Sequence, residues 1–271
     1  MGKRVALSIL LGLAAAGCAT VGTISSGDRQ AVIDRIVAAS AKVMFEQGGR
    51  RIGSGSGVVV ASRAEGPDTD AVSYVLTAAH LLEGKDGAEV FVRFTGENGV
   101  WGKFAATVPH RGSAETLDLA LLLVPGIAVP PAAFAEEDQA RLGEEILVVG
   151  FPWGKRLGLF AGIVSQVPAD GKADGSPDEG NDPTIMVDAS VANGVSGGGV
   201  FRVATGGLLG IVEGYQTASI AVKGATRTYS VKVPMPGETF VVPLARVRHF
   251  LSDAGLDGAG ARTAHGDERK D

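Results

Sequence analysis

The stretch that decides the fold is "VANGVSGGGVF", residues 191–201, in which Ser196 stands among glycines just before a short apolar run. By itself a Gly-Ser-Gly-Gly cluster predicts a tight turn, and the chain carries 40 glycines in 271 residues with which to make such turns. A nucleophilic Ser196 requires a base, an orienting carboxylate and a suitable scaffold elsewhere in the chain.

Short runs rich in Val, Ile, Leu and Phe, separated by Gly, Asp, Asn and Pro, fill the chain from Lys42 onward and indicate strands joined by turns. Six runs form a first block: "KVMFEQ", "SGVVVAS", "VSYVLTA", "EVFVRFT", "GKFAATV" and "DLALLLV". Seven form a second: "EEILVVG", "LFAGIVSQV", "TIMVDAS", "GGVFRV", "GLLGIVEGY", "TRTYSVKV" and "TFVVP". No long helix interrupts either block. We therefore predict an all-β fold of two six-stranded antiparallel barrels.

One short helix is predicted on each side of the strands. In "DRQAVIDRIVAAS", Val32, Ile36 and Val37 share one face at helical spacing. "PLARVRHFLSDAG" predicts a closing helix, with Pro243 near its first turn and Gly255 past its end.

These signals divide the chain into six segments. They are a signal segment at 1–18, a spacer and helix at 19–41, a first barrel at 42–126, a Pro- and Ala-rich linker at 127–143, a second barrel with its closing helix at 144–256, and a disordered tail at 257–271.

The N-terminus indicates export. Lys3 and Arg4 precede an apolar run too short to span a membrane, as in a secretory signal peptide. The ending "LAAAGC" resembles a bacterial lipobox, which implies lipidation of Cys18, the only cysteine of the chain. The sorting rule for such lipoproteins implies that Ala19 directs the protein to the outer membrane, facing the periplasm. An ordinary signal peptide cleaved near Ala19, or a buried Cys18, is the alternative.

Charge and motifs exclude other classes of function. The net charge is −5 and no basic cluster occurs, which argues against nucleic acid as a partner. "GSGSG" at 53–57 leads into a strand and lacks the Lys-Ser/Thr pair of a phosphate-binding loop. The acidic segment 168–183 lacks the spacing of a calcium loop and is interpreted as a surface loop. We expect neither a metal nor a cofactor.

Partners for Ser196 can be chosen from few residues. Of four histidines, His265 lies in the tail, His249 on the solvated side of the final helix, and His110 in a predicted loop. His80 lies in "SYVLTAAHLL", just after a predicted core strand stops. Its imidazole ring can be held rigidly there. Asp118 starts the apolar strand "DLALLLV", so its carboxylate is expected to be buried and to need hydrogen-bond donors.

A family resemblance emerges from these residues. "VLTAAH", "DLALL" and "GVSGG", in that order, resemble the three signature segments of trypsin-like serine proteases. "GFPWGKRLGLFAGIVSQV" and "TIMVDASVANGVSGGGVF" resemble the bacterial HtrA-type branch more narrowly. The resemblance covers about residues 42–255. Fewer than twenty residues follow the closing helix, so the PDZ domains usual in that branch are not expected.

The resemblance implies a serine endopeptidase that cleaves proteins or peptides in the periplasm. His80 is then the general base, Asp118 orients it, and the backbone N–H groups of Gly194 and Ser196 form the oxyanion hole. Val195 replaces the Asp of many relatives, so activation by propeptide cleavage is not expected. Gly199 replaces a frequent proline.

The substrate pocket can be placed by the same resemblance. Ser190 stands six residues before Ser196, where trypsins carry an Asp, so a preference for Arg and Lys is not expected. Gly214 and Tyr215 should flank the mouth, and Tyr215 favours small or medium apolar side chains. Glu213 should fall near the triad. The alternative function is a pseudoprotease, a binding scaffold or holdase that keeps the fold without turnover. The oligomeric state and the natural substrate stay open.

Overall fold

The structure is a computed structural model, and it describes residues 26–64, 71–96, 99–113, 117–168, 184–223, 228–257 and 259. The predicted lipidation site Cys18, most of the acidic segment 168–183 and nearly all of the predicted tail lie outside the described residues.

The first six strands close into a barrel in the order β1-β2-β3-β6-β5-β4. All pairs in it are antiparallel. The strands are β1 (Ser40–Gln47), β2 (Arg50–Arg63), β3 (Val72–Thr77), β4 (Glu89–Gly96), β5 (Gly99–Arg111) and β6 (Ala120–Pro125).

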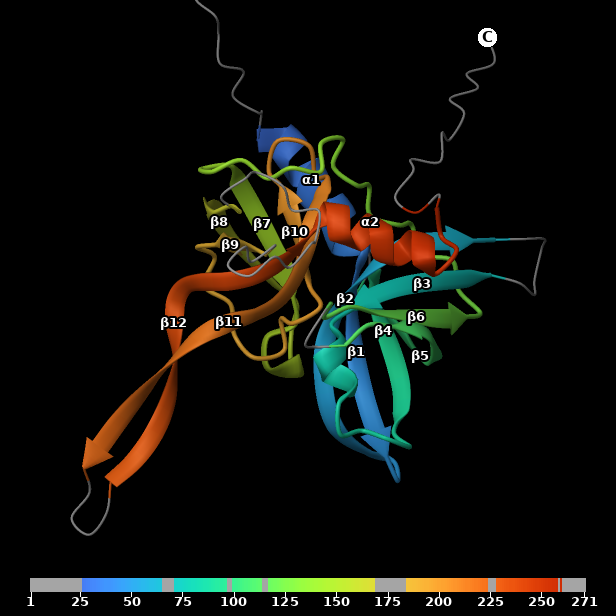
Figure 1. Cartoon of the computed structure of the whole chain (residues 1–271). Coiled ribbons are helices and arrows are strands. Elements are labelled where there is room, and N and C mark those ends of the chain that lie inside the picture. The colour runs from blue at the N-terminus through green and yellow to red at the C-terminus, as the bar shows by residue number, and fades with distance from the viewer. Residues whose placement is uncertain are drawn as a thin grey trace, which may run out of the picture.

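The other six strands close into a second antiparallel barrel in the order β10-β11-β12-β9-β8-β7, beside the first (Figure 1). These strands are β7 (Glu145–Gly150), β8 (Gly158–Gln166), β9 (Ile185–Val187), β10 (Gly199–Arg202), β11 (Leu208–Lys223) and β12 (Thr228–Pro243). The prediction of two six-stranded antiparallel barrels is confirmed.

In the part of the chain that the structure describes, two α-helices and two short 3-10 helices accompany the barrels. They are α1 (Ser26–Ala38), α2 (Leu244–Asp253), η1 (Ala79–Leu82) and η2 (Pro152–Gly154). Val32 and Ile36 of α1 are buried, as their helical spacing predicts, whereas Val37 is only half-buried. Within the described residues, no helix combines the length and the apolar character that a membrane crossing requires.

Two local predictions differ from the structure. "TRTYSVKV" and "TFVVP" are one strand rather than two, because β12 continues through the intervening Pro-containing segment and pairs with β11 as far as Thr228. His110 lies in β5 rather than in a loop, and its ring packs on Phe250 of α2 with ring centroids 4.7 Å apart.

The largest apolar cluster lies between the two barrels and beneath α2. It joins Val58 and Leu121 of the first barrel to Val149 and Phe201 of the second, with Phe250 of the closing helix against them. Each barrel also has its own apolar interior. Because this shared core is fully buried, the strand ends that meet at the junction of the barrels are held at fixed distances.

Candidate active site

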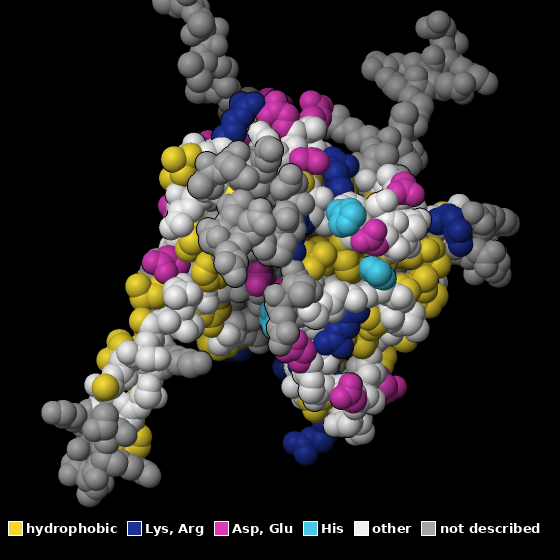
Figure 2. All heavy atoms as spheres, in the orientation of Figure 1, with side chains coloured by type: hydrophobic (Ala, Val, Ile, Leu, Met, Phe, Trp, Pro, Cys, Tyr) yellow, Lys and Arg dark blue, Asp and Glu magenta, His cyan; other side chains and the backbone are white. Residues whose placement is uncertain are grey.

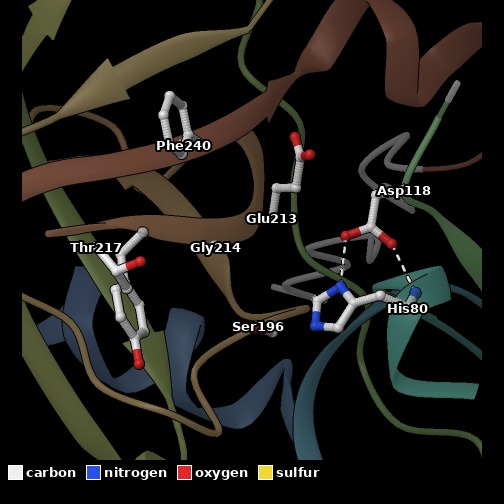
Figure 3. Close-up of a pocket in the computed structure, with 8 residues that line it drawn as sticks. His80, Asp118, Ser196, Glu213, Gly214, Thr217 and Phe240 are labelled. Carbon is white, nitrogen blue, oxygen red and sulfur yellow. Dashed lines mark hydrogen bonds and ion pairs between the residues drawn. The ribbon is translucent and has the colours of Figure 1, made fainter. Parts of the chain in front are cut away.

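A cavity of about 390 Å³ opens where strand ends and turns of both barrels meet (Figure 3). The first barrel contributes η1 and the segment just before β6, and the second contributes the turn before β10 together with β11 and β12. The residues that line the cavity are His80, Asp118, Ser196, Glu213, Gly214, Tyr215, Thr217 and Phe240.

Asp118 and His80 form a doubly hydrogen-bonded pair in this cavity. The backbone N–H of His80 donates to Oδ1 of Asp118 at 2.7 Å, and the imidazole Nδ1 lies 2.6 Å from Oδ2. Asp118 is buried, so these two donors compensate the loss of water around its carboxylate. A carboxylate only accepts, which assigns the proton of a neutral imidazole to Nδ1 and leaves Nε2 free to accept one.

The environment of His80 favours its protonated form. The hydrogen bond to Asp118 raises the pKa of His80 above the ordinary 6.5, while partial burial of the ring lowers it. The negative charges of Asp118, Glu83 and Glu213 raise this pKa further. A proton taken up by Nε2 is therefore stabilised where it arrives.

Ser196 lies on the side of the imidazole opposite Asp118 (Figure 3). Among the side-chain hydrogen bonds of the described residues, none joins Ser196 Oγ to His80. Such bonds are often long before substrate binds and tighten in the substrate complex.

The turn that carries Ser196 is fixed through its carbonyl groups. Ser56 of β2 supplies two of the bonds, because its Oγ donates to the carbonyl of Gly194 at 2.7 Å and its N–H donates to the carbonyl of Ser196 at 2.9 Å. The N–H of Trp153 donates to the carbonyl of Asn193 at 2.6 Å. A strand of the first barrel thus holds the turn of the second.

The N–H groups of the same turn divide into two kinds. Those of Val195 and Gly197 donate to backbone carbonyls at 3.1 and 2.8 Å. Those of Gly194 and Ser196 have no partner among the described residues. The carbonyl of Asn193 is bound to Trp153, so the trans peptide directs the N–H of Gly194 to the opposite side. Two unpaired N–H groups two residues apart are what an oxyanion-binding site requires.

Glycine is needed at two positions of the turn. Gly194 has φ +92°, and a Cβ there would lie 2.7 Å from the carbonyl oxygen of Phe151. Gly197 has φ +82°, and its Cβ would lie 2.3 Å from the carbonyl oxygen of Ser56. Both the positive φ and the close backbone approach exclude a side chain.

Asn193 is also held through its side chain. The hydroxyl of Tyr215, a residue that lines the cavity, donates to Oδ1 of Asn193 at 2.7 Å. Trp153, whose N–H binds the Asn193 carbonyl, has φ +57°, the one positive φ of a non-glycine residue in the described chain. Asn193, whose peptide bond carries the Gly194 N–H, is thus held through both its carbonyl and its side chain.

Residues 55–211, more than half of the chain, match the family model of the trypsin-like peptidase domain. This chain belongs to the trypsin-like peptidase family.

Curated relatives carry the same kind of domain within longer chains. The trypsin-like peptidase is 30% identical over 162 residues to the "Probable periplasmic serine endoprotease DegP-like" of Ectopseudomonas mendocina, which covers 60% of this chain and 30% of that protein. It is 29% identical over 189 residues to the protein of the same name from a Marinomonas species, covering 70% of this chain and 35% of that protein. The chain spans about a third of the length of these relatives.

Solved structures agree on the fold. The crystal structure of a serine endoprotease from Yersinia pestis superposes with a TM-score of 0.60 at 20% identity, over 85% of this chain and 68% of that one. At this level of identity, the likeness shows the trypsin-like double barrel and nothing finer.

The structure brings most of the sequence-predicted site residues of this trypsin-like peptidase together. His80, Asp118 and Ser196 share the cavity, and Gly214 and Tyr215 line it. Ser190 does not line it and is exposed. Asp118 is buried as expected but precedes β6, which begins at Ala120.

Several residues that build the site were not singled out from the sequence. Ser56 is expected only as the first residue of the strand "SGVVVAS", whereas β2 begins at Arg50 and contains all of residues 53–57. Small residues inside a strand indicate close approach of another backbone, and this signal was available. Four further residues hold the Ser196 turn or line the cavity through tertiary contacts that no sequence motif predicts. They are Asn193, Trp153, Thr217 and Phe240. The described residues contain no cluster of three or more metal-ligating side chains.

Proposed function

We propose that this trypsin-like peptidase is a serine endopeptidase in which Ser196, His80 and Asp118 form the catalytic triad. The observation that carries the proposal is the Asp118–His80 pair, 2.6 Å apart, in one cavity with Ser196. Two unpaired N–H groups on the Ser196 turn support it, and so do the DegP-like relatives, whose names describe serine endoproteases.

The chemistry follows from the positions of the donors and acceptors. Nε2 of His80 accepts the proton of Ser196 as Oγ attacks the peptide carbonyl carbon. The N–H groups of Gly194 and Ser196 donate to the oxygen that becomes negative. His80 then gives its proton to the leaving amine, and an acyl ester remains on Ser196. Water, deprotonated by His80, attacks the ester, and His80 returns this proton to Ser196 Oγ as the acyl–oxygen bond breaks and the acid product leaves.

A fluorophosphonate probe tests this proposal most directly. The probe forms a stable ester with an activated serine, so mass spectrometry of the labelled chain should place the adduct on Ser196. Adducts on another serine would contradict the assignment.

A catalytically inactive binding module is the second candidate. It is favoured by one observation: no hydrogen bond joins Ser196 Oγ to His80 among the described residues. This candidate predicts that the chain binds unfolded polypeptides but reacts neither with the probe nor with peptide substrates.

The same cavity is the proposed substrate pocket. Gly214 and Tyr215 flank it, with Thr217 and Phe240 beside them. No Lys or Arg lines the cavity, and beside the triad and Glu213 its walls combine Gly214 and Thr217 with the rings of Tyr215 and Phe240. We propose that it accepts small or medium apolar side chains. Ser190 is exposed and outside the lining, so its part in specificity is not supported.

Tyr215→Phe should lower kcat about 10-fold while changing KM little. The hydroxyl of Tyr215 holds Asn193, and the Asn193–Gly194 peptide carries a proposed oxyanion donor whose complete loss costs about 100-fold or more. Steady-state kinetics on a short chromogenic peptide measure both constants. Tyr229→Phe, which removes a hydroxyl far from the cavity, is the matched control. A raised KM with unchanged kcat would mean that the hydroxyl acts on substrate binding alone.

We also propose that the protein is a lipoprotein of the cell envelope, attached to the outer membrane through Cys18 and facing the periplasm. The lipobox-like "LAAAGC" and the periplasmic DegP-like relatives support this location.

Cys18→Ser should leave the protein either unprocessed or soluble, because the thiol that receives the lipid is lost. Fractionation of cells into soluble, inner-membrane and outer-membrane pools, followed by mass measurement of the chain, tests this. Mature Cys18→Ser protein in the outer membrane would contradict lipidation at this residue.

A further inference from the structure

The outer halves of β11 and β12 form a two-stranded arm that projects beyond both barrels (Figure 1). The arm comprises residues 217–223 and 228–235. Its two strands pair in register from Thr217↔Pro234 to Lys223↔Thr228. Among the described strands, neither pairs with any other over this length. An isolated two-stranded ribbon is marginally stable in water and normally packs on another surface.

One face of the arm is apolar. Its cross-strand pairs are Ala218↔Val233, Ile220↔Val231 and Val222↔Tyr229, and Met235 continues the alternation along β12. Residues that face each other across an antiparallel pair share a face. The other face carries Ser219, Ala221 and Ser230. We call the first set, Ala218, Ile220, Val222, Tyr229, Val231, Val233 and Met235, the apolar face.

The apolar face is open to solvent. Ile220 is 50% exposed and Val231 is 45% exposed, and hydrophobic side chains are visible along the arm in Figure 2. Half of the twelve exposed large hydrophobic residues of the described chain belong to this face. Sheets with one apolar face normally cover it, and concentrated exposed apolar surface marks an interaction site.

We propose that the apolar face binds the same face of a second copy of this chain. The face has no charged residue, so two copies meet without repulsion or unpaired charge. It is a continuous strip of cross-strand pairs, which suits the self-complementary contact of a twofold dimer. The arm projects away from both barrels, so two arms can pack face to face while the barrels stay apart (Figure 1).

The exposed area fits this occupant. Each large side chain of the apolar face is about half-exposed and leaves on the order of 75 Å² in contact with water. The six exposed large side chains therefore expose about 450 Å² in one copy, and a pair of copies would bury about 900 Å² in total. Specific interfaces begin near 1,000 Å², so the contact lies at the small end of their range. The expected product is therefore a reversible dimer rather than an obligate one.

Thiol cross-linking in a cysteine-free background tests the contact. Cys18 is the only cysteine, so a Cys18→Ser chain offers no other thiol. Ile220↔Val231 is the middle of the three cross-strand pairs, which places residue 231 close to its own counterpart. With a short bismaleimide, full-length Cys18→Ser/Val231→Cys should yield a species of twice the chain mass. Cys18→Ser/Ser230→Cys, altered at the neighbouring residue on the opposite face, should yield at least 10-fold less.

Sedimentation equilibrium of the full chain in one detergent provides the second measurement. The unmodified chain should show a two-copy mass at micromolar concentration, and Ile220→Asp/Val231→Asp a one-copy mass. Ser219→Asp/Ser230→Asp, with the same added charge on the other face, should keep the two-copy mass. Circular dichroism checks that all variants fold.

Two results would overturn the proposal. The first is that the unmodified chain sediments with the mass of one copy while the Val231→Cys and Ser230→Cys variants cross-link equally. The other is a one-copy chain whose apolar face is needed for sedimentation with phosphatidylcholine vesicles, which would make a lipid surface the occupant. No readout uses turnover, so the outcome does not depend on the proposed peptidase activity.

Discussion

Ser196→Ala should lower kcat for peptide hydrolysis by about a million-fold and abolish fluorophosphonate labelling. In the proposed mechanism, Ser196 Oγ forms the acyl ester and His80, which lines the same cavity, takes its proton, so the substitution removes the nucleophile (Figure 3). It leaves the N–H groups of Gly194 and Ser196 in place. Residual hydrolysis above the uncatalysed rate is expected from these donors alone.

The same substitution should leave the melting temperature within about 2 °C of the unmodified protein, since surface-like changes that break no packing or buried hydrogen bond shift stability little. The turn is held through the carbonyls of Gly194 and Ser196, which alanine retains. Differential scanning calorimetry measures this. Ser190→Ala, at an exposed position outside the cavity, is the matched control and should keep labelling and turnover.

The two functional candidates separate on this experiment. An unmodified chain that labels, with loss of labelling only in Ser196→Ala, supports the endopeptidase. If the unmodified chain resists the probe while binding unfolded polypeptide, the chain is a binding module. Labelling that survives Ser196→Ala would contradict the role of Ser196 itself.

The fold could be predicted because each barrel strand is a short apolar run bounded by turn residues. "DLALLLV" and "EEILVVG" correspond to β6 and β7 within a residue or two. The arm could not be predicted in the same way. Pro234 and Pro236 separate "TRTYSVKV" from "TFVVP", and proline normally ends a paired strand. In a two-stranded ribbon, one edge of each strand faces no other strand. A proline whose nitrogen lies on that edge interrupts no hydrogen bond between the strands.

The site could be predicted as far as its reactive side chains and the lining residues Gly214 and Tyr215, but not the contacts that hold it. His80, Asp118 and Ser196 were chosen because each combines a reactive group with a strand end or a glycine turn. Ser56 was missed because its role arises only when β2 of the first barrel meets the Ser196 turn of the second. Ser190 was placed in the pocket only through the family resemblance, and in the structure it is exposed and does not line the cavity.

Asp118→Asn should lower kcat about 10,000-fold without unfolding the protein. Oδ1 of asparagine can still accept the backbone N–H of His80, so the buried position stays satisfied. The amide NH₂ then faces Nδ1 of the imidazole and donates to it. The imidazole proton is therefore placed on Nε2, which faces Ser196 and can no longer accept its proton.

The pH profile separates this effect from a structural one. His80 must be neutral to act as a base, so kcat/KM should rise with pH through a pKa above the ordinary 6.5, as the Asp118 hydrogen bond dictates. Asp118→Asn removes that hydrogen bond and the charge, so the acidic limb should move to lower pH. Glu83→Gln, outside the cavity, removes only a smaller charge contribution and should move the limb slightly downward with the plateau unchanged. If Asp118→Asn lowers the plateau without moving the limb, Asp118 shapes the cavity but does not set the protonation of His80.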